Sequence, residues 1–454
     1  MRVSTLTPAT IAQLDRLGAW RGPAGLASVA APFDAMAVWD GAGTGAVHYT
    51  ADDGRRGEEG RAAGGGLAGV ARGLAVAAAA ALGLPPPPAA AVGARPASSS
   101  PASGWLGAVA ENEAVVAALV ASLRASPAPP EEAWGCGGLA ALALPPYARG
   151  PGAGASSPLA SLTLAGGQGT PPRTLTARLV VGADGAGSAA RAAAGLRVVE
   201  KKYRASAVVG TVAFAPGTPP AAARTAYQVF LPGGPLALLP LRDGHASVVW
   251  TLPHGEAAAL VEKGRAVGGE GGHGPAAFAA AVDAALQRGD PSATGTWPGR
   301  APAPPPPHVV HPAHPTPPAS FPLRLRLAPA WVRPRFALLG DAAHAVHPLA
   351  GQGVNLGFAD AACLSEALAR AVAAGGDVGA LAPTLASFYQ RARRPATGAW
   401  VAALDGLATL FGEGKGSEIG LQAGVAAAVR GAGLRAVGAV GPARAAIVRF
   451  ASGV

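Results

Sequence analysis

Residues 336–360, with the sequence FALLGDAAHAVHPLAGQGVNLGFAD, place an acid and several glycines between an apolar run and a predicted helix. The apolar run is short enough for a buried strand, which Gly340 and Asp341 would end, and Gly351 and Gly353 would begin the helix. A carboxylate at a strand end can accept hydrogen bonds from a sugar hydroxyl. The amides at a helix start have no partner within the helix and attract an electron-rich group. The stretch therefore predicts a ligand-binding turn.

The spacing of this stretch is more specific than its composition, because six positions match a known motif at once. They are Gly340, Asp341, Pro348, Gly351, Gly353 and Asn355. Their spacing resembles the second FAD-binding motif of the class A flavoprotein aromatic hydroxylases, which share the fold of p-hydroxybenzoate hydroxylase. The alternative is an ordinary strand, turn and alanine-rich helix in an α/β core.

This resemblance implies a role for each residue of the motif. Asp341, next to Gly340, would hold the ribityl hydroxyls of FAD. The backbone amides at the helix start would face the pyrimidine edge of the flavin, and they belong to Gly351, Gln352, Gly353, Val354 and Asn355. Pro348 would border the face that reacts with dioxygen, so Pro348 and Gly351 are the candidates for catalytic contacts.

A second motif lies upstream in LVVGADGAGSAAR, where an apolar run is followed by Asp184-Gly185 and then by Ser188 and Arg191. Taken alone, a strand that ends in Asp-Gly is a common structural turn. The same hydroxylases carry an Asp-Gly motif near the flavin and the nicotinamide approach, and this likeness implies that Asp184, Gly185 and Arg191 contribute to the cofactor site. The roughly 150 residues between the two motifs leave room for an inserted substrate domain.

The first motif expected of a dinucleotide-binding fold, a strand followed by G-x-G-x-x-G, is not found in the sequence. Met1 is followed at once by a stretch that resembles a helix placed well after that motif in the family, with Thr7 or Thr10 as its cap. The sequence therefore resembles a family member without its N-terminal portion. A shortened gene model, an alternative transcript and a real truncation would all give this pattern.

Further stretches resemble the ubiquinone-biosynthesis hydroxylases, and among them the eukaryotic COQ6-type monooxygenases most of all. They are RVSTLTPAT, ENEAVVAALVASL, FLPGGPLALLPL and the terminal AIVRFASG. The likeness covers most of the chain, with low-complexity interruptions at about 53–103 and 134–172 and a proline-rich one at 308–318. It implies a FAD-dependent monooxygenase that hydroxylates the aromatic ring of a polyprenylated ubiquinone precursor through a flavin C4a-hydroperoxide.

The same resemblance implies partners and a location. Besides FAD, they are a polyprenylated phenol, dioxygen and an electron donor, which is either NAD(P)H or a ferredoxin system. A complex of ubiquinone-biosynthesis proteins and peripheral contact with the matrix side of the mitochondrial inner membrane are also implied. Two alternatives remain: a related flavin hydroxylase or reductase with another aromatic or isoprenoid substrate, and a noncatalytic truncated homologue acting in a biosynthetic complex.

The elements that must position these motifs define an α/β fold. By the family likeness it consists of an incomplete Rossmann-type FAD domain of the p-hydroxybenzoate-hydroxylase type, with an inserted antiparallel β substrate domain and C-terminal helices. We expect a partial FAD-binding domain at 1–201, a β-rich substrate domain at 202–327, the return of the FAD-binding domain at 328–400 and C-terminal helices at 401–454.

The β-rich part has clear strand candidates in SAVVGTVAF, TAYQVFL, PLALLPL and ASVVWTL, which are separated by turn residues and predict an antiparallel sheet. Helices are expected at 352–374 and 384–410, divided by Gly375-Gly376 and by Pro383. Phe230, Leu238 and Trp250 are candidates for substrate contacts or for simple core residues. Asn112, at the start of another predicted helix, is a candidate for either a cap or a cofactor contact.

The formal charge of +10 could indicate nucleic acid or an anionic membrane surface. The arginines are scattered and no basic run or nucleic-acid module is found, which argues against nucleic acid. Membrane contact could use Arg391, Arg393, Arg394, Arg430 and Arg435, although codon bias explains these arginines equally well. No apolar segment of the sequence is long enough to span a bilayer.

Two cysteines, Cys136 and Cys363, imply neither a disulfide framework nor a metal cluster. Two histidine groups invite a metal hypothesis, but one lies in a proline-rich loop and the other inside the flavin-type turn, so we expect structural roles for both. These groups are His308, His311 and His314, and the pair His344 and His347.

Overall fold

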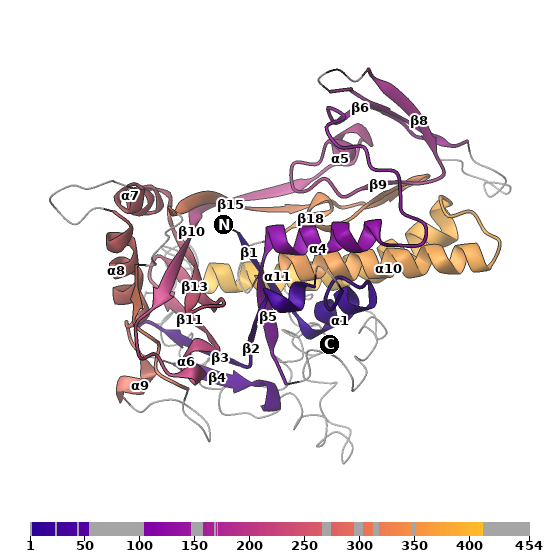
Figure 1. Cartoon of the computed structure of the whole chain (residues 1–454). Helices are drawn as coiled ribbons and strands as arrows, with labels where there is room; N and C mark the ends of the chain where they lie inside the picture. Colours follow the sequence, from indigo (N-terminus) through magenta and orange to yellow (C-terminus); the bar gives the residue numbers. More distant parts are fainter. Residues whose placement is uncertain are drawn as a thin grey trace, which may run out of the picture.

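The computed structural model describes residues 2–22, 25–42, 45–53, 104–146, 158–167, 169, 171–265, 274–294, 303–311, 317–346 and 351–411. A large sheet occupies one end of the molecule, and two long helices extend from it toward the other end, as Figure 1 shows. A smaller sheet, which includes the strands labelled β6 and β8, projects beyond these helices (Figure 1). The mixed helix-and-sheet architecture agrees with the α/β class expected from the sequence.

The large sheet has nine strands in the order β18-β15-β10-β13-β12-β11-β3-β4, with β14 paired to β10 off this path. The four strands predicted from the sequence are confirmed as β10 (Val199–Phe214), β11 (Thr225–Leu231), β12 (Gly234–Pro240) and β13 (His245–Pro253). These four form antiparallel pairs. Asp243 and Gly244, with φ values of 57° and 70°, give the β12–β13 turn the left-handed conformation that favours such residues.

The sheet also contains strands that the sequence did not assign to it. β3 (Ala35–Asp40) pairs in parallel with β11, and β4 (Ala46–Thr50) pairs with β3. The sheet is therefore not purely antiparallel, and it draws on residues far N-terminal to 202. Pairing between strands almost 200 residues apart leaves no local sequence signal. The proposed domain limits remain a prediction.

The remaining strands of this sheet are β14 (Val309–Val310), β15 (Ala319–Leu327) and β18 (His344–Ala345). α7 (His254–Arg265) and α8 (Pro275–Leu286) pack on the sheet, and short helices α6 (Pro220–Ala223) and α9 (Pro291–Thr294) lie in its connections. A Cβ at Gly210 would lie 2.6 Å from the ring of Phe278, so glycine in β10 lets α8 approach closely. Apolar residues such as Trp39, Tyr227 and Leu236 fill the core between these layers.

A second, smaller sheet holds the two strands that precede the acid–glycine motifs. Its order is β16-β17-β9, with β16 (Val332–Arg333), β17 (Phe336–Leu338) and β9 (Val180–Gly182). β17 and β9 run parallel. The apolar runs that predicted these strands, 179–181 and 336–339, agree with them within one residue at each end, and the two strands lie next to each other.

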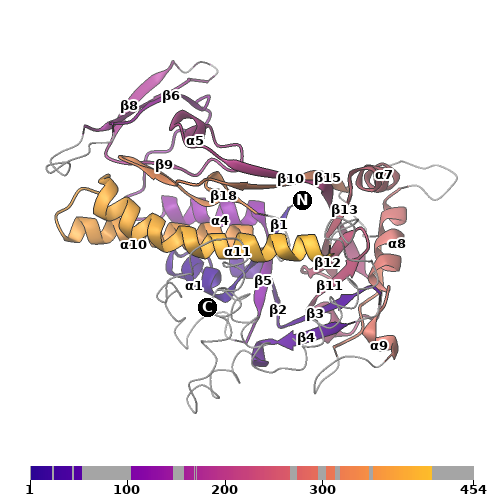
Figure 2. The same ribbon diagram turned by 180° about the vertical axis from the view of Figure 1, so that it is seen from behind.

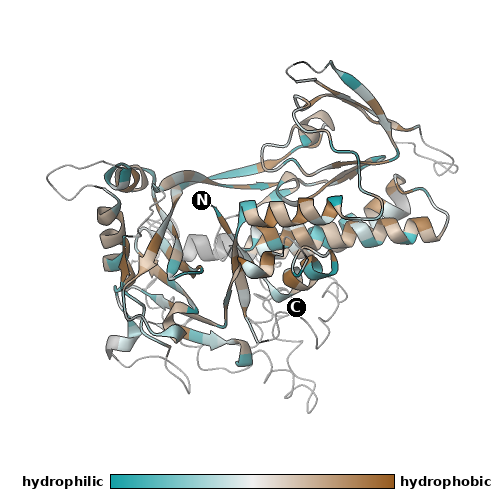
Figure 3. Ribbon diagram, viewed as in Figure 1, coloured by the Kyte–Doolittle hydropathy of each residue, from teal (hydrophilic) through white to brown (hydrophobic). Residues whose placement is uncertain are grey.

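The N-terminal segment forms a third sheet, β1-β5-β2, with β1 (Val3–Leu6), β2 (Ala31–Phe33) and β5 (Gly107–Glu111). The predicted helix is α1 (Pro8–Arg16), capped by Thr7, whose hydroxyl accepts the amide of Thr10. A 3-10 turn, η1 (Leu26–Ser28), follows, and α4 (Asn112–Arg124) comes after β5. The helices α1, α4 and α10, which carry much hydrophobic colour in Figure 3, share one apolar cluster.

The range 134–172, predicted as a low-complexity insertion, contains regular structure. β7 (Ala160–Leu164) pairs with β6 (Leu139–Ala143) on one side and β8 (Arg173–Ala177) on the other, and both pairs are antiparallel. The alternation of Leu and Thr in SLTL and RTLTA suffices for strands, although small residues elsewhere in the range hide this signal. The other predicted insertion lies almost entirely outside the described residues.

Two long helices follow the second motif and lie side by side in Figure 2. α10 (Gly353–Ala373) agrees with the predicted helix at 352–374. The helix predicted at 384–410 is separated from α10 as expected, but it begins three residues earlier, because a π-helix, η4 (Leu381–Gln390), includes Pro383 and continues into α11 (Arg391–Phe411). Proline is tolerated in the first turn of a helix, where its missing N–H has no helical partner. No described helix is long and apolar enough to cross a membrane.

Candidate functional site

The two acid–glycine motifs lie together, at the carboxyl ends of neighbouring parallel strands. Val180 pairs with Phe336 and Gly182 with Leu338, and the amide of Leu339 donates to the carbonyl of Gly182 at 3.0 Å. Asp184 follows the end of β9, and Asp341 follows the end of β17. In open α/β sheets, ligands bind beyond this edge of the strands.

Arg191, in the short helix α5 (Ala189–Ala193), joins the two turns. Its guanidinium donates to the carbonyl of Ala342 at 2.7 Å and to that of Ala186 at 3.0 Å. Arg326 donates to the same Ala186 carbonyl at 2.8 Å. Burial, and then the charge of Arg326, lowers the pKa of Arg191 from its ordinary high value. Arg191 therefore acts as a brace between the motifs, and a direct cofactor contact for it stays a prediction.

Asp184 is used locally, although its side chain is exposed. Its carboxylate accepts the backbone amide of Ala190 at 2.9 Å, and the Ser188 hydroxyl accepts that of Arg191 at 2.8 Å. Partial burial by itself would raise the pKa of Asp184, but the hydrogen bonds from Ala190, Ser188 and neighbouring amides together lower it. Gly185, with φ 82°, permits the turn. These contacts explain the helix start, and cofactor binding by Asp184 and Gly185 remains a proposal.

Asp341 presents the opposite situation. It lies in the 3-10 turn η2 (Gly340–Ala342), its side chain is exposed, and no donor among the described residues bonds its carboxylate. The protein around it nevertheless displaces enough water to raise the pKa of the carboxyl, an effect that the charge of nearby His344 partly offsets. The Asp341 carboxylate is thus reachable from solvent but partly shielded from water by the protein around it. A carboxylate in this setting is suited to accept a hydrogen bond from a ligand hydroxyl.

The turn that carries Asp341 is held from two further sides. The amide of Gly340 donates to the carboxylate of Asp360 at 3.2 Å, and the hydroxyl of Tyr389 donates to the carbonyl of Leu338 at 2.7 Å. A Cβ added at Gly340 would lie 3.6 Å from the Cα of Gly357, so the turn lies directly against α10. The φ of 56° at Gly340 favours glycine there.

The start of α10 leaves its first amides without a helical partner, and no side chain in the described part of the chain caps them. Gly351 has φ 61°, and a Cβ there would lie 2.9 Å from the hydroxyl oxygen of Thr5. The side chain of Val354 packs into the apolar cluster under α1, and Gln352 is buried. Only backbone groups of Gly351, Gln352, Gly353 and Val354 can therefore serve as the predicted cofactor contacts, which stay a prediction.

The side chain of Asn355 is used within the protein. Its carbonyl oxygen accepts the hydroxyl of Thr10 at 2.8 Å and the amide of Thr7 at 3.1 Å, and its nitrogen donates to the carbonyl of Thr5 at 2.7 Å. Asn112 likewise accepts the Ser4 hydroxyl at 2.7 Å. Both asparagines therefore hold the N-terminal segment in place. The remaining candidate of this motif, Pro348, lies outside the described residues.

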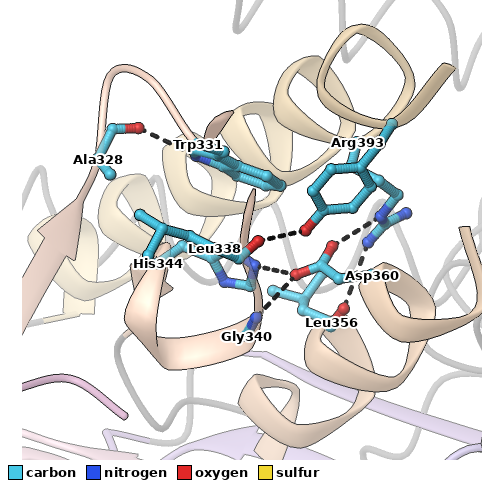
Figure 4. A network of polar contacts seen from close by, with 9 residues as sticks. Ala328, Trp331, Leu338, Gly340, His344, Leu356, Asp360 and Arg393 are labelled. Carbon is cyan, nitrogen blue, oxygen red and sulfur yellow. Dashed lines mark hydrogen bonds and ion pairs between the residues drawn. The ribbon is translucent and has the colours of Figure 1, made fainter. Parts of the chain in front are cut away.

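Sequence reasoning missed a buried network of charged and polar groups behind the turn, shown in Figure 4. Asp360, completely buried on α10, accepts hydrogen bonds from Gly340, His344 and Arg393. Arg393 was considered for membrane contact, but its side chain is only 13% exposed and bonds Asp360. A lone acid within the apolar pattern of a helix was the one available signal, because its partners lie 16 to 33 residues away.

The other candidates are placed as follows. Leu238 is completely buried in the core of the large sheet, with Trp250 packed against the same core, which favours packing roles. Phe230 belongs to a different cluster with Tyr49, Val346 and Trp400, between the sheet and the segment after β18.

Of the histidines considered for a metal site, His308 bonds Asp283, while His314 and His347 lie outside the described residues. Among the described residues, no group of three or more His, Cys, Asp and Glu could hold a metal.

Comparison with known proteins agrees with this geometry. A family model described as an FAD-binding domain matches residues 160–263 and 308–402, which include both turns and the start of α10. Two solved structures share the fold. The probable FAD-dependent monooxygenase pqsL from Pseudomonas aeruginosa has a TM-score of 0.54 at 21% identity, covering 92% of this chain and 88% of that one. The p-nitrophenol 4-monooxygenase PnpA from Pseudomonas putida has a TM-score of 0.54 at 16% identity, covering 100% and 88%.

Sequence relatives are more specific. The mitochondrial ubiquinone biosynthesis monooxygenase COQ6 of Xenopus tropicalis is 34% identical over 76% of this chain and 71% of its own length. The Mus musculus COQ6 is 36% identical over 65% of this chain, which spans 60% of that protein. The ubiquinone hydroxylase UbiL of Rhodospirillum rubrum is 35% identical, with 64% and 57% covered. The chain thus belongs to the COQ6-type family of FAD-dependent monooxygenases, as stretches such as RVSTLTPAT and FLPGGPLALLPL indicated.

Proposed function

We propose that this chain is a FAD-dependent monooxygenase of ubiquinone biosynthesis that hydroxylates the aromatic ring of a polyprenylated ubiquinone precursor. The relatives named above are ubiquinone-biosynthesis enzymes by name, and the FAD-binding family model spans both acid–glycine turns of this chain. One observation carries the proposal: Asp341 stands exposed beside the uncapped start of α10, with its turn braced by Arg191 and Asp360.

The residues around this turn fit FAD. An unbonded carboxylate at the strand end offers an acceptor for the ribityl hydroxyls, and the free amides of α10 offer donors to the electron-rich pyrimidine edge. A side chain on Gly351 would press on Thr5, so the backbone there stays bare. Bound FAD supplies the oxygen-activating chemistry, and the protein binds the flavin, orients the ring of the substrate and keeps water away from it.

The aromatic ring of the substrate belongs, in this proposal, between the large sheet and the flavin turn. Phe230 is the best of the predicted contacts, because its cluster includes Val346 and Trp400 from the elements that surround the second motif. Pro348 remains proposed for the face that reacts with dioxygen. The electron donor is NAD(P)H or a ferredoxin system.

The cellular setting follows the same proposal. The COQ6 relatives are mitochondrial by name, and a polyprenylated precursor resides in a bilayer, so we place this protein peripherally on the matrix side of the mitochondrial inner membrane. Contact with other proteins of ubiquinone biosynthesis is part of the proposal. Arg391 and Arg394 remain candidates for membrane contact, whereas the side chain of Arg393 bonds Asp360.

The experiment is to purify the chain, add FAD and measure flavin absorbance in the protein after gel filtration. A polyprenylated phenol and a reductant are then supplied under oxygen, and the hydroxylated product is identified by mass spectrometry. We expect retained flavin and a product heavier by one oxygen atom. Retained flavin without that product would overturn the proposed substrate assignment. Absence of bound flavin would overturn the proposed enzyme function altogether.

A further inference from the structure

The carboxylate of Asp360 is completely buried and bonded on both of its oxygens. Oδ2 accepts the backbone amide of Gly340 at 3.2 Å and Nε2 of His344 at 2.5 Å. Oδ1 accepts Nε of Arg393 at 2.8 Å. A carboxylate oxygen only accepts hydrogen bonds, so in this contact Nε2 of His344 is the donor.

The two donors on Oδ2 bracket Asp341. Gly340 precedes it directly, and His344, also completely buried, follows three residues later in β18. One carboxylate of α10 therefore binds both ends of the segment that presents Asp341. The same helix supplies the free amides at its start, seven residues before Asp360. Asp360 thus links the two proposed halves of the flavin site.

The third donor comes from a separate element. Arg393 lies in the first turn of α11 and also donates to the carbonyl of Leu356 at 3.4 Å. The π-helix before it contributes Tyr389, bonded to Leu338, and Gln390, which accepts the amide of Trp331 at 2.7 Å. Trp331 in turn lies over His344 with ring centroids 5.1 Å apart. Figure 4 shows how these groups from separate elements meet around the carboxylate of Asp360.

A buried ion is costly, and an apolar side chain of similar size would pack as well without that cost. Asp360 must therefore contribute something besides packing. We propose that Asp360, with His344 and Arg393, is a positioning residue that sets the Gly340–Ala342 turn at the separation from α10 at which Asp341 and the helix start bind one FAD together. This inference rests on the proposed function only through FAD binding.

The test is Asp360→Asn, which keeps the shape of the side chain but replaces one acceptor oxygen by a donor group. We expect FAD to bind at least about tenfold more weakly in a fluorescence-quenching titration, with a shifted absorbance spectrum of the bound flavin. The thermal midpoint of the flavin-free protein is measured in parallel, because loss of a buried ion pair also destabilises the fold.

Asp377→Asn is the matched control. Asp377 forms an ion pair with Arg335, whose side chain is 4% exposed, at the other end of β17 and away from Asp341. We expect this variant to lower the thermal midpoint while changing the FAD affinity less than about twofold. Equal FAD affinities in the Asp360→Asn, Asp377→Asn and unaltered proteins would overturn the proposal.

His344 gives a second pair of variants if Asp360→Asn does not fold. His344→Gln can still donate to Asp360, and His344→Ala cannot, so the first should retain more FAD affinity than the second. Identical affinities would overturn the positioning role. Because none of these readouts requires turnover, a failure to hydroxylate the proposed substrate leaves this result intact, and the two inferences can be distinguished.

Discussion

The two acid–glycine turns end neighbouring strands, and both acids have exposed side chains, yet their surroundings differ. Asp184 accepts the amide of Ala190 and holds the start of α5, whereas no described donor reaches the carboxylate of Asp341. The pKa shifts run in opposite directions, downward for Asp184 and upward for Asp341. An acid that completes a helix start is committed to local structure, whereas an unbonded one is available to a ligand.

The two turns also differ in what holds them. Arg191 braces both, but the Asp341 turn is held in addition by Asp360 of α10 and Tyr389 of η4. Long-range bonds behind an unbonded acid are the arrangement expected of a rigid binding site. The comparison predicts that changes at the first turn affect stability and changes at the second affect the ligand.

The largest expected effect is that of Asp341→Ala on FAD. Loss of hydrogen bonds to a charged acceptor should weaken binding by about 1.5–3 kcal/mol, or roughly 10- to 150-fold. At neutral pH the flavin-free protein should lose no thermal stability and should gain a little, because the carboxylate has no hydrogen-bond partner among the described residues and its partial desolvation disfavours the charged form. Equilibrium titration with FAD tests this, and unchanged affinity would remove the distinction between the turns.

Alanine at Gly340 or Gly185 should cost about 1–2 kcal/mol in each case, because both have positive φ. At neither position would a Cβ meet another atom closer than 3.6 Å, so backbone strain is the common cause. Urea unfolding should give similar losses for Gly340→Ala and Gly185→Ala. FAD affinity should fall further in Gly340→Ala, and the reverse order would contradict the comparison.

Asp184→Ala should destabilise the protein by about 0.5–1 kcal/mol, the lower part of the range for helix caps, since the side chain is exposed. FAD affinity should fall less than in Asp341→Ala. Chemical denaturation with and without FAD measures both quantities. A larger loss of FAD affinity than Asp341→Ala produces would make Asp184 the principal cofactor acid.

The pH dependence of stability should be the smallest difference, with opposite signs for the two acids. A lowered pKa means that Asp184 stabilises the fold above its ordinary pKa, and that this contribution is lost as the pH falls through the lowered value. A raised pKa means that the contribution of Asp341 is present below its ordinary pKa and is lost as the pH rises through the raised value. Denaturation of the flavin-free Asp184→Asn and Asp341→Asn proteins from acidic to neutral pH tests the signs.

Much of this site could be predicted from local spacing. The strands before both motifs, the helix after Gly351 and the cap at Thr7 follow from apolar runs, glycines and a hydroxyl at set positions. The family likeness added the cofactor, which the relatives support. Spacing alone could not separate the roles of Asp184 and Asp341, since both end a strand beside a glycine.

The sequence by itself determined where the chain turns and which short segments are strands or helices, because those preferences depend on neighbouring residues. Only the tertiary structure decided that β3 pairs with β11, that Arg191 bonds Ala342 and that the side-chain amide of Asn355 bonds Thr5 and Thr10. The tertiary structure also showed that Arg393, which the sequence suggested for membrane contact, forms an ion pair with the buried Asp360. Such contacts join residues that are far apart along the chain, and only the packed fold brings them within hydrogen-bonding distance.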